Sequence, residues 1–237
     1  KGYTFNSKTG TEGVLLSLVH WGIEALNKFN GMFAFAFYDN FKKELIIARD
    51  RYGIKPLYYS LIDKVFSFGS EQKSIILQPS FSKQIDLPAL MEYLTFQNIF
   101  TDRTLLKNIN ILPAGHFGVL KHQDKKITIK KFWDFKFEEP NNKLNKSEYI
   151  EELRFLFKQA VKRQLVSDVE LGCYLSGGMD SGAITAIASK AYPNLKTFTC
   201  GFDISSASGL ELSFDERSKA EAMSALFKTE QYEMVLK

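Results

Sequence analysis

Hydrophobic and polar positions follow two different periods along the chain. Apolar residues recur at helical spacing over residues 14–29, which predicts an amphipathic helix. Over residues 31–39, large and small side chains alternate at a period of two, which is typical of a strand with one bulky and one close-packed face. A turn at Asp39 and Asn40 is then predicted to return the chain as a second strand over residues 44–50.

The remaining apolar runs of the first part predict two hairpins and two helices. The hairpins pair residues 56–60 with 65–69 and residues 118–120 with 127–129, and the helices cover residues 72–77 and 87–95. This part is therefore rich in short antiparallel strands.

Residues 136–146 are polar, charged and interrupted by proline, so we interpret them as a linker between a domain at 1–135 and a domain at 147–237. Ser147 is predicted to cap a long helix over residues 148–165. Strands and helices then alternate, at residues 172–175, 183–191, 196–202, 217–227 and 231–235. Such alternation predicts a parallel sheet with helices packed on it.

Composition narrows the class of protein. The 237 residues are 45% hydrophobic and 24% charged, which is typical of a soluble globular protein, and the chain contains neither a membrane-spanning apolar run nor a signal-peptide pattern. The net charge of +4 is spread along the chain, so no nucleic-acid-binding stripe is predicted. Cys173 and Cys200 lie in apolar strand-like runs, which favours buried thiols in a reducing, cytoplasmic compartment over a disulfide or a metal site.

The most informative segment is a glycine-rich loop between a predicted strand and a predicted helix. Adjacent glycines let backbone N–H groups approach an anion, and the helix start adds unpaired donors and a positive dipole end. The predicted ATP- and pyrophosphate-binding residues are Ser176, Gly177, Gly178, Asp180 and Ser181. A carboxylate beside a phosphate requires charge compensation, so Asp180 predicts Mg²⁺ at the site. The alternative is a plain Ser/Gly turn that caps a helix, with Asp180 as a first-turn charge.

No lysine precedes the serine of this loop, so it is not a P-loop. It resembles instead the SGGxDS pyrophosphate loop of the ATP pyrophosphatases. In the first part, four motifs in order resemble the glutaminase domain of glutamine-hydrolysing asparagine synthetases. These motifs occupy residues 26–36, 48–59, 70–75 and 112–116. Within the second motif, Arg49, Asp50, Arg51 and Lys55 invite a catalytic interpretation, but the resemblance favours an architectural role.

The resemblance implies a two-domain protein of α/β and α+β class. A partial N-terminal-nucleophile αββα sandwich is followed by the start of a parallel-sheet α/β adenine-nucleotide hydrolase-like (PP-loop) domain. It also implies a ligase that uses ATP and Mg²⁺ and amidates aspartate to asparagine with ammonia from glutamine. The reaction passes through β-aspartyl-AMP and releases AMP and pyrophosphate, and a homodimer is a possible assembly.

Further site residues are carried over from the family. Tyr174, Leu175 and Cys200 match positions that contact the adenosine moiety, although core packing is an equal alternative for Tyr174 and Cys200. Gly10 stands where the family has an aspartate that holds the glutamine amine, and Glu12 is a weak substitute for it or simply a residue of a first helical turn.

The family's N-terminal cysteine nucleophile has no counterpart in this chain, so the glutaminase part is assigned no catalytic residue. The chain begins without Met, partway into an extended segment, and stops at a predicted strand end. We therefore expect a piece that is truncated at both ends and inactive by itself. Residues 205–209 are predicted to be a flexible insertion.

Two other functions stay open. A related synthetase could adenylate a different carboxylate, as β-lactam-forming relatives do, and the substrate pocket would decide between them. A degenerate, non-catalytic glutaminase-like module is favoured slightly by Gly10, whereas the intact loop at Asp180 argues against it.

Overall fold

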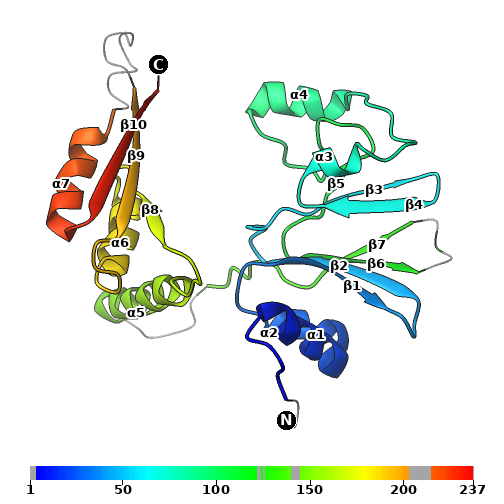
Figure 1. Ribbon diagram of the computed structural model, residues 1–237, viewed down its shortest axis with the longest axis horizontal. Coiled ribbons are helices and arrows are strands. Elements are labelled where there is room, and N and C mark those ends of the chain that lie inside the picture. The colour runs from blue at the N-terminus through cyan, green and yellow to red at the C-terminus, as the bar shows by residue number, and fades with distance from the viewer. Residues whose placement is uncertain (1–3, 122–123, 125, 140–144, 203–214, 237) are drawn as a thin grey trace. The chain divides into compact units, whose positions relative to one another are not determined.

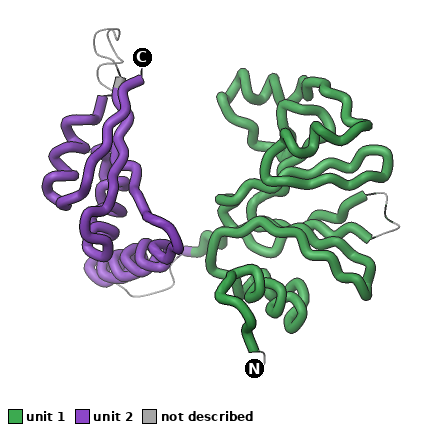
Figure 2. Tube along the Cα trace, in the orientation of Figure 1, with its two compact units in different colours: residues 1–138 green, residues 139–237 purple. Residues whose placement is uncertain are grey.

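The computed structural model of the protein describes residues 4–121, 124, 126–139, 145–202 and 215–236. The chain divides into two compact units, Lys1–Glu138 and Glu139–Lys237, which are coloured separately in Figure 2. The sequence-predicted insertion at residues 205–209 and most of the linker centre, residues 140–144, lie outside the described residues. Among the helices that are described, none is long and apolar enough to cross a membrane.

The first unit begins with three short helical segments where one continuous helix was predicted. These are α1 (Gly10–Trp21), the 3₁₀ segment η1 (Gly22–Glu24) and α2 (Ala25–Lys28). The prediction of an unbroken helix is wrong because Gly22 has a φ of 60°, a conformation that glycine adopts at little cost and that ends α1. The resulting bend leaves Leu26 fully buried.

Two antiparallel sheets form the centre of this unit. One sheet has the order β1-β2-β6-β7, from strands Ala34–Asp39, Glu44–Arg49, His116–Lys121 and Thr128–Lys131. The other has the order β4-β3-β5, from strands Val65–Gly69, Tyr58–Ile62 and Asn110–Ile111. Between β3 and β4, Asp63 and Lys64 both have positive φ (50° and 66°), as a tight hairpin turn of type I′ requires.

Apolar side chains pack these elements into four layers, with helices outside and the two sheets inside (Figure 1). Neighbouring residues of β2 pack into different hydrophobic clusters, because the side chains of a strand alternate between its two faces. Ile47 joins Leu57, Tyr59 and Leu112 in a cluster between the sheets. Ala48 joins Leu26 and Phe117 in a cluster on the side of α2.

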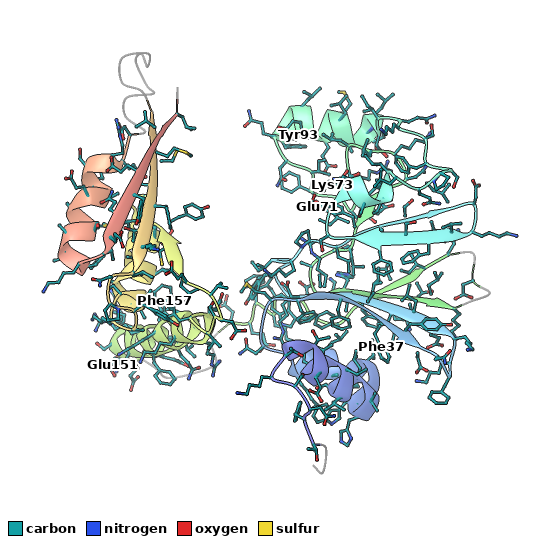
Figure 3. All side chains as sticks on the ribbon, viewed as in Figure 1. Phe37, Glu71, Lys73, Tyr93, Glu151 and Phe157 are labelled. Atoms are coloured by element: carbon teal, nitrogen blue, oxygen red, sulfur yellow. The ribbon has the colours of Figure 1, made fainter. Side chains whose placement is uncertain are left out.

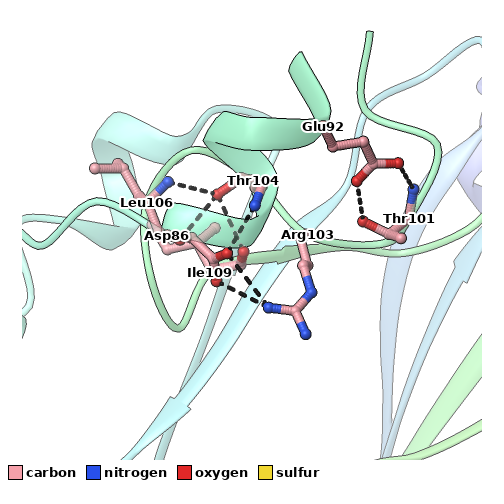
Figure 4. Close-up of polar contacts among 8 residues, drawn as sticks. Asp86, Glu92, Thr101, Arg103, Thr104, Leu106 and Ile109 are labelled. Atoms are coloured by element: carbon pink, nitrogen blue, oxygen red, sulfur yellow. Dashed lines mark hydrogen bonds and ion pairs between the residues drawn. The ribbon is translucent and has the colours of Figure 1, made fainter. Parts of the chain in front are cut away.

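The opposite outer layer consists of α3 (Gln72–Ile75) and α4 (Leu87–Phe96). An ion pair of 2.7 Å joins Lys73 to Glu71 at the start of α3 (Figure 3). Figure 4 shows the polar contacts around α4, where Asp86 caps the helix through the Ala89 N–H (3.0 Å) and the Glu92 carboxylate accepts from the Thr101 N–H (3.2 Å) and hydroxyl (3.0 Å). The Glu92 carboxylate also accepts from the Phe100 N–H at 2.7 Å. These contacts hold the following loop against the helix.

The second unit alternates helices and strands around a parallel sheet of order β10-β9-β8. Its elements are α5 (Lys146–Gln164), β8 (Gly172–Tyr174), α6 (Met179–Ala188), β9 (Lys196–Phe202), α7 (Arg217–Phe227) and β10 (Glu230–Leu236). Asn145, not Ser147, is the N-cap of α5. The Asn145 side chain accepts from the backbone of Ser147 and Glu148, and the Glu148 carboxylate accepts from the Asn145 N–H, which completes a capping box that the sequence prediction missed.

The two faces of this parallel sheet differ in burial. On β9, Thr197 and Thr199 are buried, whereas Phe198 and Cys200 face outward and are exposed. The prediction of two buried thiols is therefore wrong for Cys200, because the period-two alternation of the strand turns it to the open face, and Cys173 is only partly buried. Burial raises the pKa of the Cys173 thiol.

Candidate functional site

The predicted phosphate loop begins where β8 ends and closes where α6 begins. Leu175 anchors its first end, because the Leu175 N–H donates to the Phe198 carbonyl (2.9 Å) and the Leu175 carbonyl accepts from the Thr199 hydroxyl (2.8 Å). The Leu175 side chain is 1% exposed. The loop therefore leaves a fixed point in the core and returns to a fixed helix.

Two hydroxyl groups close the loop on itself. The Ser176 and Ser181 oxygens lie 3.1 Å apart, and the Ser181 oxygen also accepts from the Ser176 N–H (3.2 Å). The Gly178 N–H donates to the Ser176 hydroxyl at 3.3 Å. These bonds are at the long end of the normal range, so an anion could replace them at small cost.

Gly177 has a second role that the sequence did not reveal. Its φ is +77°, and a Cβ added there would lie 2.6 Å from the Lys219 Cβ and 3.1 Å from the Ala220 nitrogen. The loop thus packs directly against the first turn of α7, more than 40 positions farther along the chain. No local sequence pattern signals that contact, because it joins distant segments.

Asp180 lies in the first turn of α6 and is exposed. In the part of the chain that the structure describes, its carboxylate makes no hydrogen bond or ion pair, and no three His, Cys, Asp or Glu side chains there gather as a ready metal site. The N-cap residues of α6 and α7 make no side-chain cap, in contrast to those of α4 and α5, and at α7 the Asp215 carboxylate accepts from the Arg217 N–H (3.1 Å). Free N–H donors and an unpaired carboxylate therefore meet at this loop.

The three residues expected to contact adenosine separate into two environments. Tyr174 is 88% exposed and lies on the same open sheet face as Cys200, whereas the Leu175 side chain points into the core. Phe198 lies across from Tyr174, with ring centroids 6.5 Å apart, and stacks on Tyr232 at 5.5 Å. Phe198 and Tyr232 were not singled out in the sequence and extend the aromatic surface.

In the first unit, Gly10 starts α1 and a Cβ there would meet nothing within 4 Å. The Glu12 carboxylate accepts from the Asn6 N–H (2.8 Å), the Ser7 N–H (2.6 Å) and the Ser7 hydroxyl (2.6 Å). These hydrogen bonds, that from Asn6 first, lower the pKa of Glu12. Glu12 is thus engaged by the preceding segment and is not free to replace a missing aspartate without a rearrangement.

Arg49, Asp50 and Arg51 form hydrogen bonds with backbone groups, and the buried Arg51 Nε has no hydrogen-bond partner among the described residues. The Asp50 carboxylate, 1% exposed, accepts from four backbone N–H groups, and the Arg49 guanidinium donates to three carbonyls. Arg51 donates to the carbonyls of Phe29 and Asn27. These contacts support an architectural role for the segment. Burial lowers the pKa of Arg49.

Two family profiles match the chain. The glutamine amidotransferase domain matches residues 1–133, and the asparagine synthase domain matches residues 152–237. These ranges fall in the first and second compact units respectively.

Individual relatives agree with the profiles. Glutamine-hydrolysing asparagine synthetase 1 of Bacillus subtilis is 36% identical over 204 residues, which is 86% of this chain and 32% of the relative. A putative glutamine-hydrolysing asparagine synthetase 2 of Methanocaldococcus jannaschii is 30% identical over 241 residues, which is 99% of this chain and 45% of the relative. The chain therefore spans between about a third and a half of the length of these relatives.

Among solved structures, glutamine phosphoribosylpyrophosphate amidotransferase of B. subtilis, complexed with ADP and GMP, is similar at 12% identity and a TM-score of 0.38. The similarity covers 98% of this chain and 40% of that chain. At that score the likeness supports no statement about the fold.

Proposed function

The chain belongs to the glutamine-hydrolysing asparagine synthetase family, and we propose that the whole protein amidates aspartate at the expense of ATP, with ammonia taken from glutamine. In this proposal the first unit is the glutaminase domain, of N-terminal-nucleophile type. The second unit begins the ATP-binding domain, of PP-loop type. The enzyme is a ligase of amino-acid biosynthesis, and the cytoplasm is its expected compartment.

The proposed chemistry has two steps. A β-carboxylate oxygen of aspartate attacks the α-phosphorus of ATP, the bond from that phosphorus to the bridging oxygen breaks, and pyrophosphate leaves. The nitrogen of ammonia then attacks the β-carbonyl carbon of β-aspartyl-AMP, so that AMP leaves and one proton is lost. Adenylation is needed because a free carboxylate has no adequate leaving group.

One observation carries the proposal: a closed Ser–Gly–Gly loop joins a parallel strand to an uncapped helix and holds an unpaired carboxylate. The N–H groups of the loop and the hydroxyls of Ser176 and Ser181 would bind the pyrophosphate portion of ATP. Asp180 is suited to hold Mg²⁺, because its exposed carboxylate oxygens have no other partner among the described residues. Bound there, Mg²⁺ would neutralise charge on the phosphates.

The exposed face of the β10-β9-β8 sheet is the proposed binding site of the nucleoside. Tyr174 and Cys200 lie on that face, with Phe198 as the neighbour of Tyr174 and Cys200 two residues farther along β9, close to the carboxyl ends of the strands, where ligands of parallel sheets bind. Leu175 would contribute through the position of its backbone, since its side chain is buried. A second carboxylate substrate in place of aspartate remains the alternative, because no residue of the chain is assigned to the acceptor.

Glutamine use is a separate part of the proposal. The family aspartate that pairs with the glutamine amine is replaced by Gly10, and Glu12 is held by Asn6 and Ser7. We expect glutamine to be a poorer nitrogen donor than ammonia, since the charged amine of glutamine has lost its carboxylate partner. The open surroundings of Gly10 allow Gly10→Asp to be made without a clash, and that variant should lower the KM for glutamine.

The decisive test is product analysis of the whole protein with ATP, Mg²⁺, aspartate and ammonia. We expect AMP and pyrophosphate in equal amounts with asparagine. ADP and phosphate would refute the adenylation chemistry, and AMP formation with another carboxylate but not with aspartate would favour the alternative acceptor. Absence of ATP turnover together with absence of ATP binding would favour a non-catalytic module.

A further inference from the structure

We propose that Lys219, in the first turn of α7, is a pyrophosphate-binding residue of the phosphate loop. The inference rests on the proposed function of that loop. A P-loop contains a lysine that binds the phosphates, and the loop of residues 175–181 has no such lysine. In this proposal Lys219 supplies the missing positive charge. Its ligand class is the β,γ-diphosphate of a nucleoside triphosphate, or free pyrophosphate.

The contact between loop and helix places Lys219 at the site. A Cβ built on Gly177 would lie 2.6 Å from the Lys219 Cβ, so the backbone of the loop and the stem of the lysine are in direct contact. The lysine stem carries its ammonium group on four flexible carbons. From that Cβ the ammonium group can therefore reach an anion bound over Gly177 and Gly178.

The charge balance of the loop calls for such a cation. Pyrophosphate is strongly negative, and Asp180 adds a further negative charge, while residues 175–181 contain no Lys or Arg. Mg²⁺ at Asp180 would compensate only part of that charge. A cation from outside the loop is needed to bind the leaving group.

Two cationic residues lie in the first turn of α7, and only Lys219 is uncommitted. The Arg217 guanidinium donates to the Asp215 carboxylate through both Nε (2.9 Å) and Nη2 (2.6 Å), and Arg217 passes over Gly201 at the end of β9. Lys219 is exposed and, within the described ranges, forms no ion pair or hydrogen bond. Its ammonium group is thus available without breaking an existing interaction.

The test measures the affinity of the whole protein for inorganic pyrophosphate in the presence of Mg²⁺, by calorimetric titration. We expect Lys219→Met to raise the Kd about tenfold, which is the usual worth of one hydrogen bond to a charged group. Lys219→Arg should stay within about threefold of the unchanged protein, because it keeps the charge. Lys228→Met, at the far end of the same helix, is the matched control and should leave the Kd unchanged.

Two further readouts exclude a purely structural effect. The thermal unfolding midpoint of Lys219→Met should equal that of the unchanged protein, and its Kd should depend less steeply on salt, because one charge contact is lost. AMP has no β- and γ-phosphates for Lys219 to contact. The Kd for AMP should therefore change less in Lys219→Met than the Kd for pyrophosphate.

The outcomes separate this inference from the function on which it rests. If the unchanged protein binds pyrophosphate but Lys219→Met binds it equally well, Lys219 is not part of the site and the proposed function stands. Equal losses for AMP and pyrophosphate, or equal losses in Lys219→Met and Lys228→Met, also overturn the assignment. If the unchanged protein does not bind pyrophosphate at all, the loop is not a pyrophosphate site, and the proposed function and this inference fail together.

Discussion

Two polar, glycine-containing turns of this protein have opposite relations to their surroundings. In the turn of residues 49–55, Asp50 is buried and accepts four backbone N–H groups, and Arg49 donates to three carbonyls. In the loop of residues 175–181, the hydroxyls of Ser176 and Ser181 bond to each other and to backbone groups of the loop, and Asp180 has no partner among the described residues. Each turn has a glycine at positive φ, Gly53 and Gly177.

The difference separates a turn that builds the fold from one that is suited to bind a ligand. A buried charge is tolerated only when it is hydrogen-bonded, and the side chains of Asp50 and Arg49 already form such bonds with the backbone. Exposed groups that are satisfied weakly can exchange their partners for a ligand. Each turn contains an aspartate and at least one glycine, so the presence of these residue types alone does not show which aspartate is buried.

The largest expected effect comes from Asp50→Ala. It leaves up to four backbone N–H groups without an acceptor, and each such group costs about 1–3 kcal/mol when buried, so we expect the free energy of unfolding to fall by about 4 kcal/mol. Trp21 and Trp133 are the two tryptophans of the chain and both belong to the first unit. Denaturant unfolding followed by their fluorescence therefore reports on this unit.

Asp50→Asn sharpens that experiment. The amide keeps one acceptor oxygen but turns an NH₂ group toward the other pair of N–H donors, so it should recover no more than half of the loss. A decrease below about 1 kcal/mol for Asp50→Ala would show that the turn does not depend on this carboxylate.

Asp180→Ala should have the opposite effect to Asp50→Ala: a loss of activity without a loss of stability. We expect aspartate-dependent ATP–pyrophosphate exchange to fall by about 10²–10³-fold, because an electrostatic contact at the reacting phosphates is lost, while unfolding is unchanged. Asp168→Ala, an exposed carboxylate shortly before β8, serves as the control and should retain normal exchange. Near-normal exchange in Asp180→Ala would make Asp180 a simple first-turn charge.

A pair of glycine substitutions tests the packing of the loop on α7. Gly177→Ala forces a side chain into φ +77° and against Lys219, so we expect a loss of about 1–2 kcal/mol of stability. Gly178→Ala has a φ of −79°, and its Cβ would meet only the Ser176 hydroxyl at 3.3 Å. Because glycine is preferred to alanine at the N-cap, Gly178→Ala should cost about 0.5–1 kcal/mol, less than Gly177→Ala. Thermal unfolding followed by circular dichroism compares the two, and equal losses would mean that the contact with α7 is unimportant.

The smallest effect concerns Glu12 and pH. Its pKa is lowered from the ordinary 4.5 by hydrogen bonds, first that from Asn6, so these bonds are fully present above pH 4.5 and are lost as the pH falls through the lowered pKa. The Ser7 amide resonance in an NMR titration should move with that pKa. In Glu12→Gln the same resonance should not titrate, and an unchanged Ser7 resonance in acid in the unmodified protein would contradict the contact.

Local signals in the sequence located most helices and strands. The hairpin between β3 and β4 followed from its apolar alternation, and α7 and β9 have the predicted bounds, Arg217–Phe227 and Lys196–Phe202. Errors arose where a cap or a glycine conformation decided the boundary. Asn145 displaced Ser147 as the cap of α5 through a local capping box with Glu148, and Gly22 divided the first helix because its backbone adopts a positive φ.

By itself, the sequence determined the strand–loop–helix at residues 175–181, the alternation that makes a parallel sheet, and the motifs of the family. These features are encoded by neighbouring residues, through spacing and local conformational preference. Only the tertiary structure decided which polar groups stay free. It buried Asp50 among backbone donors, engaged Glu12 with Asn6 and Ser7, and brought Lys219 against Gly177. The contact of Lys219 with Gly177 and the bond from the Phe33 N–H to Asp50 join segments that lie apart along the chain, so no local pattern carries them. The bonds to Glu12 and the other bonds to Asp50 span six positions or fewer and depend on the path that the backbone takes there.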